Sequence, residues 1–300
     1  VGIGKGAELG ILIKNSEALE NASRVTCAAF DKTGTLTTGT MTVTNIVAVD
    51  TISEHELLSV CASLERYANH PIGEAIVQFA NNNQVALNDV EDISVAEGKG
   101  VMGTIAQKKV IVGSSDFIQD YMPFEATIAQ KMKEFEDEGK TVVVVAQEKL
   151  YGIIALSDTP RADANNVIRS LRQRGIKTAM LTGDNRLSAL AIAHEIGIDV
   201  VYADVKPEDK MNVVKQLQKD GDIVTFIGDG INDAPVLAQA DIGIALGSGT
   251  DVAIEAGDVV LLRNRLRDVV TYFELAVKVM RRIKQNIFWA FAYNAVLVPV

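Results

Sequence analysis

The residues best suited to chemistry lie where an apolar run ends on an acid, in the stretch "AAFDKTGTLTTGT" at positions 28–40. Its aspartate, Asp31, precedes a series of threonines and glycines. A lone carboxylate at such a point is a turn residue or a nucleophile, and small residues after it let the backbone approach a phosphate or a metal ion. Two later acidic turns, "TGD" at 182–184 and "GDGIND" at 228–233, raise the same choice.

The hydrophobic pattern predicts the elements that position these acids. From Asp158 onward, β-branched runs alternate with helical segments, which is typical of a parallel sheet with helices on both faces. Residues 25–31 have the same character, and their apolar side chains favour a central place in that sheet. The predicted strands are 177–184, 199–205, 222–230, 241–246 and 258–262, and the predicted helices are 162–174, 187–196, 208–219 and 232–239.

The predicted strand ends bring the acidic turns together, because the reactive crevice of an open parallel sheet lies beyond the carboxyl ends of its strands. Lys210, in "KPEDK" at the start of a predicted helix, supplies a cation for the same crevice. Carboxylates, a hydroxyl group, a cation and backbone amides are what phosphoryl transfer requires. The motifs "TGD" and "GDGIND" are weak signals when taken alone, whereas "DKTGTLT" is a strong one, and three such segments at strand ends in this order are very unlikely by accident.

Residues 43 to about 156 have a different pattern. Helices are predicted at about 54–66, 72–83 and 125–138, and antiparallel strands in "ISVAEGKGVMGTIAQKKVIVGSS" and "TVVVVAQEKLYGIIALSD". This is an α+β pattern. We therefore predict an α/β domain whose first strand is separated from the others by an inserted domain, with joints near 39–42 and 156–160.

Composition excludes several classes of protein. The chain has 300 residues, 48% of them apolar and 23% charged, which describes a folded chain of one large or two ordinary domains. The formal net charge of −10 argues against a nucleic-acid partner. Cys27 and Cys61 are isolated, so neither a disulfide framework nor a zinc site is indicated, and a reducing cytosolic compartment is expected.

The two ends of the sequence suggest a piece of a longer protein. The first residues, "VGIGKGAELGILIK", begin abruptly, and we interpret 1–13 as a linker from a preceding membrane helix. Near the other end, Arg281, Arg282 and Lys284 precede an apolar stretch at 286–300. This charge order is typical of a chain that enters a membrane from the cytosol, although the stretch is shorter than the roughly 20 residues of a full span. The alternative is a buried amphipathic or core helix.

The motifs "DKTGTLT", "TGDN", "PEDK" and "GDGINDAP" resemble those of the catalytic part of P-type ATPases, a branch of the haloacid-dehalogenase-like fold. The resemblance extends over nearly the whole chain and implies ATP and Mg²⁺ as cofactors. It implies that Asp31 is the nucleophile that takes the γ-phosphoryl group of ATP. Thr182 and Lys210 would then bind the phosphoryl oxygens.

The same resemblance implies a magnesium site. Its ligands would be Asp31, Asp229 and the backbone carbonyl of Thr33, and Asn232 and Asp233 would order the shell around the ion. In the "TGDN" motif, Asp184 would contact the nucleotide.

The residue at position 33 gives a separate physical argument. Phosphatases of this fold usually carry a second aspartate two positions after the nucleophile, where it serves as general acid and then as base. Here that position is Thr33. An aspartyl phosphate should therefore form but hydrolyse slowly, which suits an intermediate that persists through a conformational change.

The inserted domain resembles the nucleotide pocket of the heavy-metal-transporting branch of the family. "LERYANHPIGEAI" followed by "AEGKGV" places Glu65, His70, Gly98 and Gly100 where that branch surrounds the adenine. Taken alone, His70 before a proline is more often a helix-start residue, and a single GxG is weak. Two departures, Asn69 before the His-Pro pair and Ser114 in "VGSS", affect the expected nucleotide contacts but not the phosphorylation site.

The final apolar stretch resembles the membrane helix of copper-transporting members in which a Tyr-Asn pair lines the ion path, which points to Tyr293 and Asn294. A polar amide in a membrane segment is costly and is therefore expected to be functional. The resemblance thus implies a copper(I)-exporting ATPase. The partners it implies are copper(I), a copper chaperone, and an actuator domain and membrane helices of the same chain, with this portion at the cytoplasmic face of a membrane.

Three hypotheses compete with copper export, namely a zinc or cadmium exporter of the same family, a soluble phosphatase with an inserted cap, and a nucleotide-binding module without catalysis. The predicted fold class is α/β, with a haloacid-dehalogenase-like phosphorylation domain and an inserted α+β nucleotide-binding domain built on an antiparallel sheet. The predicted boundaries are 1–13 linker, 14–39 and 157–284 phosphorylation domain, 40–156 nucleotide-binding domain, and 285–300 start of a truncated membrane helix.

Overall fold

The chain folds into two compact units, each with its own sheet. Unit 1 comprises Val1–Thr38 and Pro160–Val300, and unit 2 comprises Gly39–Thr159. The computed structural model describes residues 2–49, 52–68, 70–96, 98–124, 126–229, 233–247 and 251–297, without the side chains of 253 and 294–297. The chain passes from unit 1 to unit 2 between residues 38 and 39 and returns between 159 and 160, within three residues of the expected joints.

Unit 1 is built on a seven-stranded sheet in the order β1-β13-β12-β11-β2-β9-β10. All neighbouring pairs are parallel except β1 with β13. The strands are β1 (Ile11–Ile13), β2 (Cys27–Asp31), β9 (Lys177–Leu181), β10 (Val200–Tyr202), β11 (Val224–Gly228), β12 (Ile242–Leu246) and β13 (Val259–Leu261).

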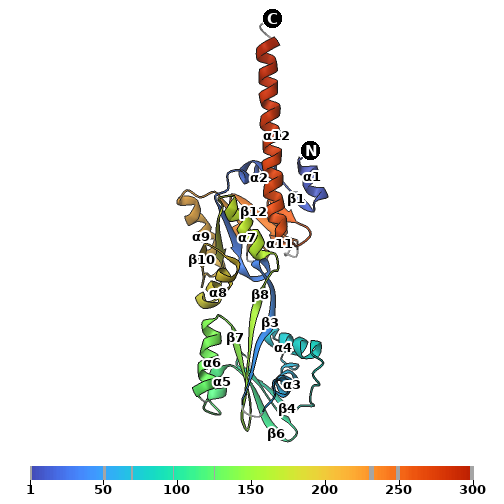
Figure 1. Cartoon of the computed structure of the whole chain (residues 1–300), viewed down its shortest axis with the longest axis vertical. Helices are drawn as coiled ribbons and strands as arrows, with labels where there is room; N and C mark the ends of the chain where they lie inside the picture. Colours follow the sequence, from blue (N-terminus) through green and yellow to red (C-terminus); the bar gives the residue numbers. More distant parts are fainter. Residues whose placement is uncertain are drawn as a thin grey trace. The chain divides into compact units, whose positions relative to one another are not determined.

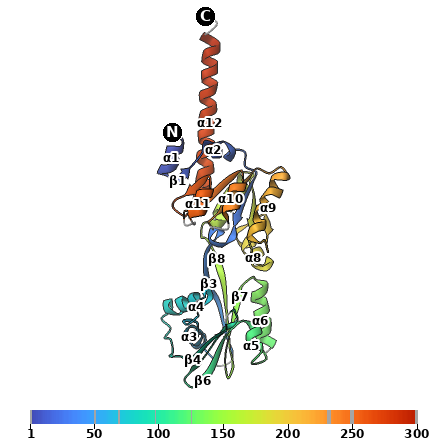
Figure 2. The same ribbon diagram turned by 180° about the vertical axis from the view of Figure 1, so that it is seen from behind.

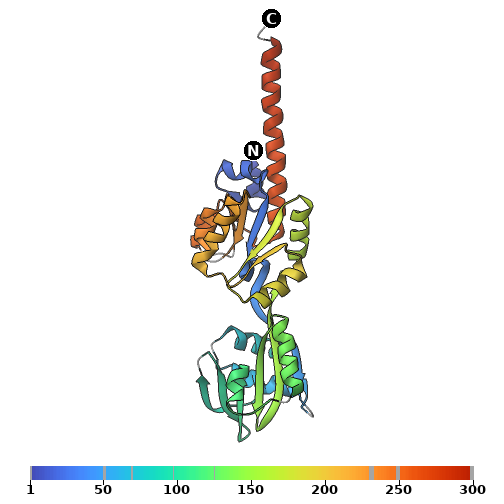
Figure 3. The ribbon, with the colours of Figure 1, turned by 90° about the vertical axis from the view of Figure 1, so that its left-hand side faces the viewer.

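The strand that ends on Asp31 lies inside this sheet, between β11 and β9, and every residue of it is buried. Its side chains alternate between two apolar clusters: Ala28 and Phe30 belong to one, Cys27 and Ala29 to the other. Helices therefore cover both faces of β2, as Figure 3 shows. The helices of unit 1 are α1 (Gly2–Glu8), α2 (Ser16–Ala22), α7 (Ala164–Gln173), α8 (Arg186–Ile196), α9 (Pro207–Lys219), α10 (Ala234–Gln239), α11 (Asp251–Ala256) and α12 (Arg267–Leu297).

The N-terminal segment differs from the predicted linker. Residues 2–8 form α1, and β1 adds an antiparallel edge strand to the sheet, with Leu12 opposite Val260. Ile11 and Ile13 are buried, whereas Leu12 is 41% exposed. A three-residue strand that buries alternate side chains leaves too short a pattern to be recognised in sequence, and the connection of 1–13 to a preceding membrane helix stays a prediction.

Unit 2 is a six-stranded sheet in the order β3-β8-β7-β6-β5-β4, and the four successive pairs between β8 and β4 are antiparallel. α3 and α4 pack on one face and α5 and α6 on the other (Figure 2). The elements are β3 (Thr37–Ala48), α3 (Glu54–Glu65), α4 (Pro71–Asn82), β4 (Glu91–Ala96), β5 (Gly100–Ile105), β6 (Lys108–Gly113), α5 (Ser115–Gln119), α6 (Ala126–Asp137), β7 (Thr141–Gln147) and β8 (Lys149–Pro160).

The last helix, α12, runs without a break across the boundary predicted at 284/285 (Figure 1). Its first half packs on unit 1, where the buried Tyr272 donates a hydrogen bond to the carbonyl of Ala18 at 2.6 Å. Every side chain from Arg281 to Phe291 is exposed. No glycine or proline interrupts the helix at this point, and the start of a membrane segment at 285 stays a prediction.

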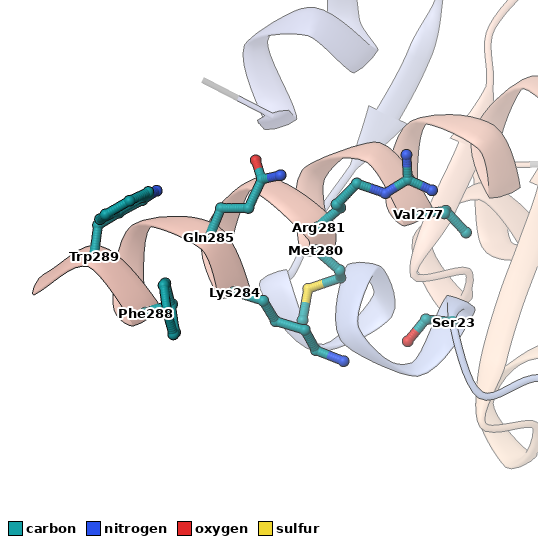
Figure 4. Close-up of a pocket in the computed structure, with 8 residues that line it drawn as sticks. All are labelled: Ser23, Val277, Met280, Arg281, Lys284, Gln285, Phe288 and Trp289. Carbon is teal, nitrogen blue, oxygen red and sulfur yellow. The ribbon is translucent and has the colours of Figure 1, made fainter. Parts of the chain in front are cut away.

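The exposed half of α12 changes from basic to aromatic. Arg281 and Lys284 line a groove together with Ser23, which follows α2. Phe288 and Trp289 line the same groove, and Figure 4 shows them at its end away from Ser23. Among the described residues, no helix is both long and apolar enough to cross a membrane.

Candidate active site

The centre of the candidate site is a buried salt bridge at the end of β2. Asp31 is 7% exposed, and its Oδ1 accepts a hydrogen bond from the ammonium group of Lys210 at 2.6 Å. The same ammonium group donates to Asp233 at 2.9 Å. Lys210 reaches both acids because Pro207 starts α9 three residues earlier, which places the lysine in the first helical turn.

Three carboxylates converge beside this lysine. One oxygen from each of Asp31, Asp229 and Asp233 lies within 4.8 Å of the other two. Asp229 follows β11, and Asp233 precedes α10, so a neighbouring parallel strand brings two acids to the end of β2. Asn232, predicted to share the magnesium shell, lies outside the described residues.

Burial and mutual repulsion disfavour the charges of these acids. Burial and, after it, the carboxylate of Asp233 raise the pKa of Asp31 to about 7, although the ammonium group of Lys210 acts in the opposite direction. The pKa of Asp229 is also raised, first by burial and then by Asp233. One lysine does not balance three crowded acids, so the residues fit an additional cation with oxygen ligands, as Mg²⁺ requires.

The turn after Asp31 brings the backbone against one of these acids. Gly34 has a φ of +78°, and a Cβ atom at this position would lie 2.3 Å from Oδ2 of Asp229. Only glycine fits such an approach. The residue two positions after Asp31 is Thr33, and its side chain is exposed. This position therefore carries no acid.

Thr182 and Asp184 follow β9, the other neighbour of β2. Thr182 is 2% exposed, and its hydroxyl oxygen accepts a hydrogen bond from the backbone N–H of Asp184 at 3.1 Å. The hydroxyl proton of Thr182 is therefore available for donation. Asp184 forms an ion pair with the buried Lys32, the residue after Asp31. Its predicted contact with nucleotide remains a prediction.

The four residues predicted to surround an adenine line one cavity of unit 2, about 180 Å³ in volume. Glu65 comes from the end of α3, and His70 precedes α4. Gly98 lies in the turn before β5, and Gly100 is the first residue of that strand. Ser114 also lines it. Asn69 lies outside the described residues.

Glu65 and His70 are held in different ways. Glu65 is 7% exposed, and burial raises the pKa of its carboxyl group to about 7. His70 caps α4, where its Nδ1 accepts a hydrogen bond from the N–H of Ile72 at 3.3 Å. The helix-start interpretation of His70 thus holds together with its position in the cavity, and Nε2 is the nitrogen that carries the proton in the neutral ring.

Sequence reasoning did not identify Gly73, Lys32 or Arg161. A Cβ atom on Gly73 would lie 2.6 Å from Oε2 of Glu65, so this glycine makes room for the buried carboxylate. Lys32 joins the first and second acidic turns through Asp184. The position of Lys32 inside "DKTGTLT" could have identified it from the sequence. Gly73 and Arg161 could not be identified in this way, because their contacts are with residues outside their own motifs.

A family model described as haloacid dehalogenase-like hydrolase matches residues 25–241. The chain belongs to this family. The match includes the β2 acid, the inserted unit 2 and the acids after β11, and it confirms the predicted fold class of this haloacid dehalogenase-like hydrolase.

The relatives of this haloacid dehalogenase-like hydrolase are P-type ATPases. A probable copper-exporting P-type ATPase of Archaeoglobus fulgidus is 48% identical over the whole chain, which covers 37% of that protein. A silver exporting P-type ATPase of Salmonella typhimurium is 43% identical over the whole chain, which covers 36% of it. The crystal structure of a zinc-transporting PIB-type ATPase in the E2.Pi state is 42% identical and superposes with a TM-score of 0.93, covering 98% of this chain and 48% of that one.

These comparisons confirm the prediction that the chain is a P-type ATPase segment, although the names of the relatives give different ions. The predicted ion-path residues give no further information. Tyr293 is 67% exposed, and the side chain of Asn294 lies outside the description.

Proposed function

We propose that the chain is the ATP-binding, self-phosphorylating portion of a copper(I)-exporting P-type ATPase. The observation that carries the proposal is the buried Asp31, held by Lys210 at 2.6 Å beside two further acids, with a threonine where a phosphatase has its second acid. This arrangement favours forming an aspartyl phosphate over hydrolysing it.

In the proposed reaction, an Oδ atom of Asp31 attacks the γ-phosphorus of ATP, the bond to the bridging oxygen breaks, and ADP leaves. Lys210 and the hydroxyl group of Thr182 stabilise the charge that develops on the phosphoryl oxygens. Asp31, Asp229 and the Thr33 carbonyl would hold Mg²⁺, and Asn232 and Asp233 would order its shell. When bound, Mg²⁺ supplies the positive charge that lets an anionic carboxylate approach an anionic phosphate.

The test is phosphorylation of the full-length protein with γ-labelled ATP and Mg²⁺. We expect an acid-stable phosphoenzyme that hydroxylamine removes, as an acyl phosphate requires. Rapid hydrolysis of a generic phosphate ester by the 300-residue chain, without a phosphoenzyme, would instead support a soluble phosphatase. Binding of ATP without label in either protein would indicate a module without catalysis.

The cavity of unit 2 is proposed to bind the adenine, with Glu65, His70, Gly98 and Gly100 around it. The carboxylate of Glu65 would accept a hydrogen bond from the exocyclic amino group. This role would explain why the buried position 65 carries a glutamate, although burial raises the pKa of its carboxyl group to about 7. A side chain with only a packing role would not need a carboxylate.

Replacement of Glu65 by glutamine should lower ATP affinity about tenfold at pH 8, because a charge-assisted hydrogen bond is lost. Ionisation of the buried carboxyl group destabilises the wild-type fold. The protonated group therefore contributes its full stability below its ordinary pKa of 4.5, and this contribution is lost as the pH rises through about 7. The variant should therefore melt a few degrees higher than wild type at pH 8, and the two melting temperatures should converge near pH 5.

Titration calorimetry between pH 6 and 8 measures the affinity, and scanning calorimetry measures the melting temperature. Titration of the nucleotide phosphates changes the ATP affinity of wild type and Glu65→Gln alike. A difference between the two pH profiles therefore reports the carboxyl group of Glu65 alone. Identical pH profiles for wild type and variant would contradict the role of the carboxylate.

Copper(I) is proposed as the transported ion because Tyr293 and Asn294 match the Tyr-Asn pair of copper transporters, and because the Archaeoglobus relative is named a probable copper exporter. Zinc is the second candidate, favoured by the zinc-transporting structure that superposes on the chain. ATPase activity of the full-length protein, measured with copper(I) or zinc, separates the two. Stimulation by zinc alone would overturn the copper proposal.

The location and partners are proposed on the same basis. Basic residues followed by the exposed aromatic half of α12 suit the cytoplasmic face of a membrane, with membrane helices of the same chain covering the apolar surface. An actuator domain and a copper chaperone would be further partners, and the net charge of −10 disfavours nucleic acid.

A further inference from the structure

We propose that Arg161 is a positioning residue that joins the turn after Asp31 to the start of α12, with Asn264 as the link between them. This proposal rests on the phosphorylation of Asp31 proposed above. Arg161 follows Pro160, the first residue of unit 1 after the chain returns from unit 2. Its contacts all lie within unit 1.

On one side, Arg161 donates hydrogen bonds to three backbone carbonyls between Gly34, in the turn, and Thr37, at the start of β3. Nη2 donates a hydrogen bond to the carbonyl of Gly34 at 2.5 Å, and Nε donates to the carbonyl of Thr37 at 3.2 Å. The backbone N–H of Arg161 donates to the carbonyl of Leu36 at 2.9 Å. Gly34 is the residue whose backbone lies against Asp229, so Arg161 fixes the peptide that shapes the acidic site.

On the other side, the same guanidinium group holds Asn264. Nη1 donates to its backbone carbonyl at 3.1 Å, and Nη2 donates to its side-chain Oδ1 at 3.3 Å. Asn264 has a φ of +48°, a conformation that asparagine tolerates better than most residues. It lies between the end of β13 at Leu261 and the start of α12 at Arg267.

A second contact ties the same segment to α12. The carboxylate of Asp163, two residues after Arg161, accepts a hydrogen bond from the backbone N–H of Arg267 at 3.0 Å. This N–H belongs to the first residue of the helix and has no partner within it. Residues 161–163 therefore contact the turn after Asp31 and the first residue of α12.

The chemistry of the contacts requires arginine. All four side-chain bonds of Arg161 go to neutral carbonyl or amide oxygens, and among the described residues it forms no ion pair. A planar guanidinium group presents several donors in fixed directions, whereas a lysine ammonium group is a compact point charge. The group thus serves as a rigid bracket, and a lysine in its place would reach only part of the acceptor set.

Through this bracket, phosphorylation of Asp31 would be coupled to the start of α12. Any shift of the Gly34 peptide on phosphorylation changes the bonds of Arg161, and through Asn264 it changes the segment that begins the helix. Conversely, loosening Asn264 should disturb the phosphorylation site, although Asn264 itself contacts none of the three acids. Reciprocity of this kind distinguishes the bracket from ordinary packing.

The test compares Arg161→Lys, Asn264→Gly and the double variant in the full-length protein. We expect the rate of phosphoenzyme formation to fall about tenfold in Arg161→Lys and about threefold in Asn264→Gly, with the KM for ATP unchanged. Glycine removes Oδ1 without straining the backbone, so this variant isolates the hydrogen bond. The double variant should be no slower than Arg161→Lys, because the two residues act as one unit. Asn264→Asp, which keeps the acceptor, should restore the wild-type rate.

The matched control is Arg174→Lys. Arg174 also connects α7 with α12, through a surface ion pair with Glu274 at 2.8 Å, but contacts no part of the Asp31 turn. It should leave the rate unchanged. A wild-type rate of phosphoenzyme formation in Arg161→Lys would overturn the bracket. So would a double variant in which the rate reductions of the two single variants multiply. Absence of phosphoenzyme from the wild-type protein would instead overturn the proposed function. Should Arg161→Lys fail to fold, the comparison of Asn264→Gly with Asn264→Asp decides.

Discussion

Replacing Asp31 by asparagine is expected to abolish the acid-stable phosphoenzyme, a reduction of at least a thousandfold that brings the signal to background. The amide nitrogen cannot attack phosphorus as a carboxylate does, and among the described residues no other carboxylate ends β2. The measurement is incorporation of γ-labelled phosphate from ATP with Mg²⁺, followed by acid quenching and hydroxylamine treatment.

Stability and nucleotide binding control for this result. Asparagine has nearly the same shape, and it removes a charge that burial and Asp233 disfavour, so the melting temperature should not fall. Lys210 keeps its second partner at 2.9 Å. ATP binding to unit 2 should also be unchanged. Labelling of Asp31→Asn at the wild-type level would show that another residue is the nucleophile.

Replacing Gly34 by alanine should reduce phosphoenzyme formation by at least a hundredfold although no reacting atom is removed. The added Cβ would lie 2.3 Å from Oδ2 and 2.9 Å from Cγ of Asp229, both far inside van der Waals contact. The turn or the carboxylate must move, and either movement separates Asp229 from Asp31. The measurement is the same labelling experiment over a range of Mg²⁺ concentrations, and a raised Mg²⁺ requirement is expected for whatever activity remains.

Gly175→Ala is the matched control for backbone strain. Gly175 has a φ of +76°, close to that of Gly34, but nothing lies within 4 Å of the place its Cβ would take. Both variants should lose about 1 kcal/mol of stability from the left-handed conformation. Only Gly34→Ala should lose phosphorylation. Equal loss in both variants would mean that strain, and not contact with Asp229, is responsible.

The arrangement of Asp31, Thr182 and Asp229 could be predicted because it follows from topology. Each residue ends or follows a largely buried strand, and parallel strands deliver their carboxyl ends to one edge of a sheet. The neighbours β11 and β9 flank β2, so the three motifs had to meet. Lys210 could be added because its helix begins at a proline, which fixes the turn on which the lysine lies.

Other features depend on contacts that no local pattern encodes. Gly73 makes room for Glu65 across eight residues of sequence and two helices, and Arg161 reaches Asn264 across 103 residues. Neither pair has a characteristic spacing. The strand β1 was missed because burial of two isoleucines in a three-residue strand gives no recognisable period.

The unbroken course of α12 has a mechanical consequence. Its 31 residues correspond to a rod roughly 46 Å long at 1.5 Å per residue. A tilt of about 5° at the first turn would displace the far end by about 4 Å, roughly three quarters of the 5.4 Å pitch of the helix. A lever of these proportions would convert a small rotation beside Asn264 into a displacement of several ångströms at the far end of the helix.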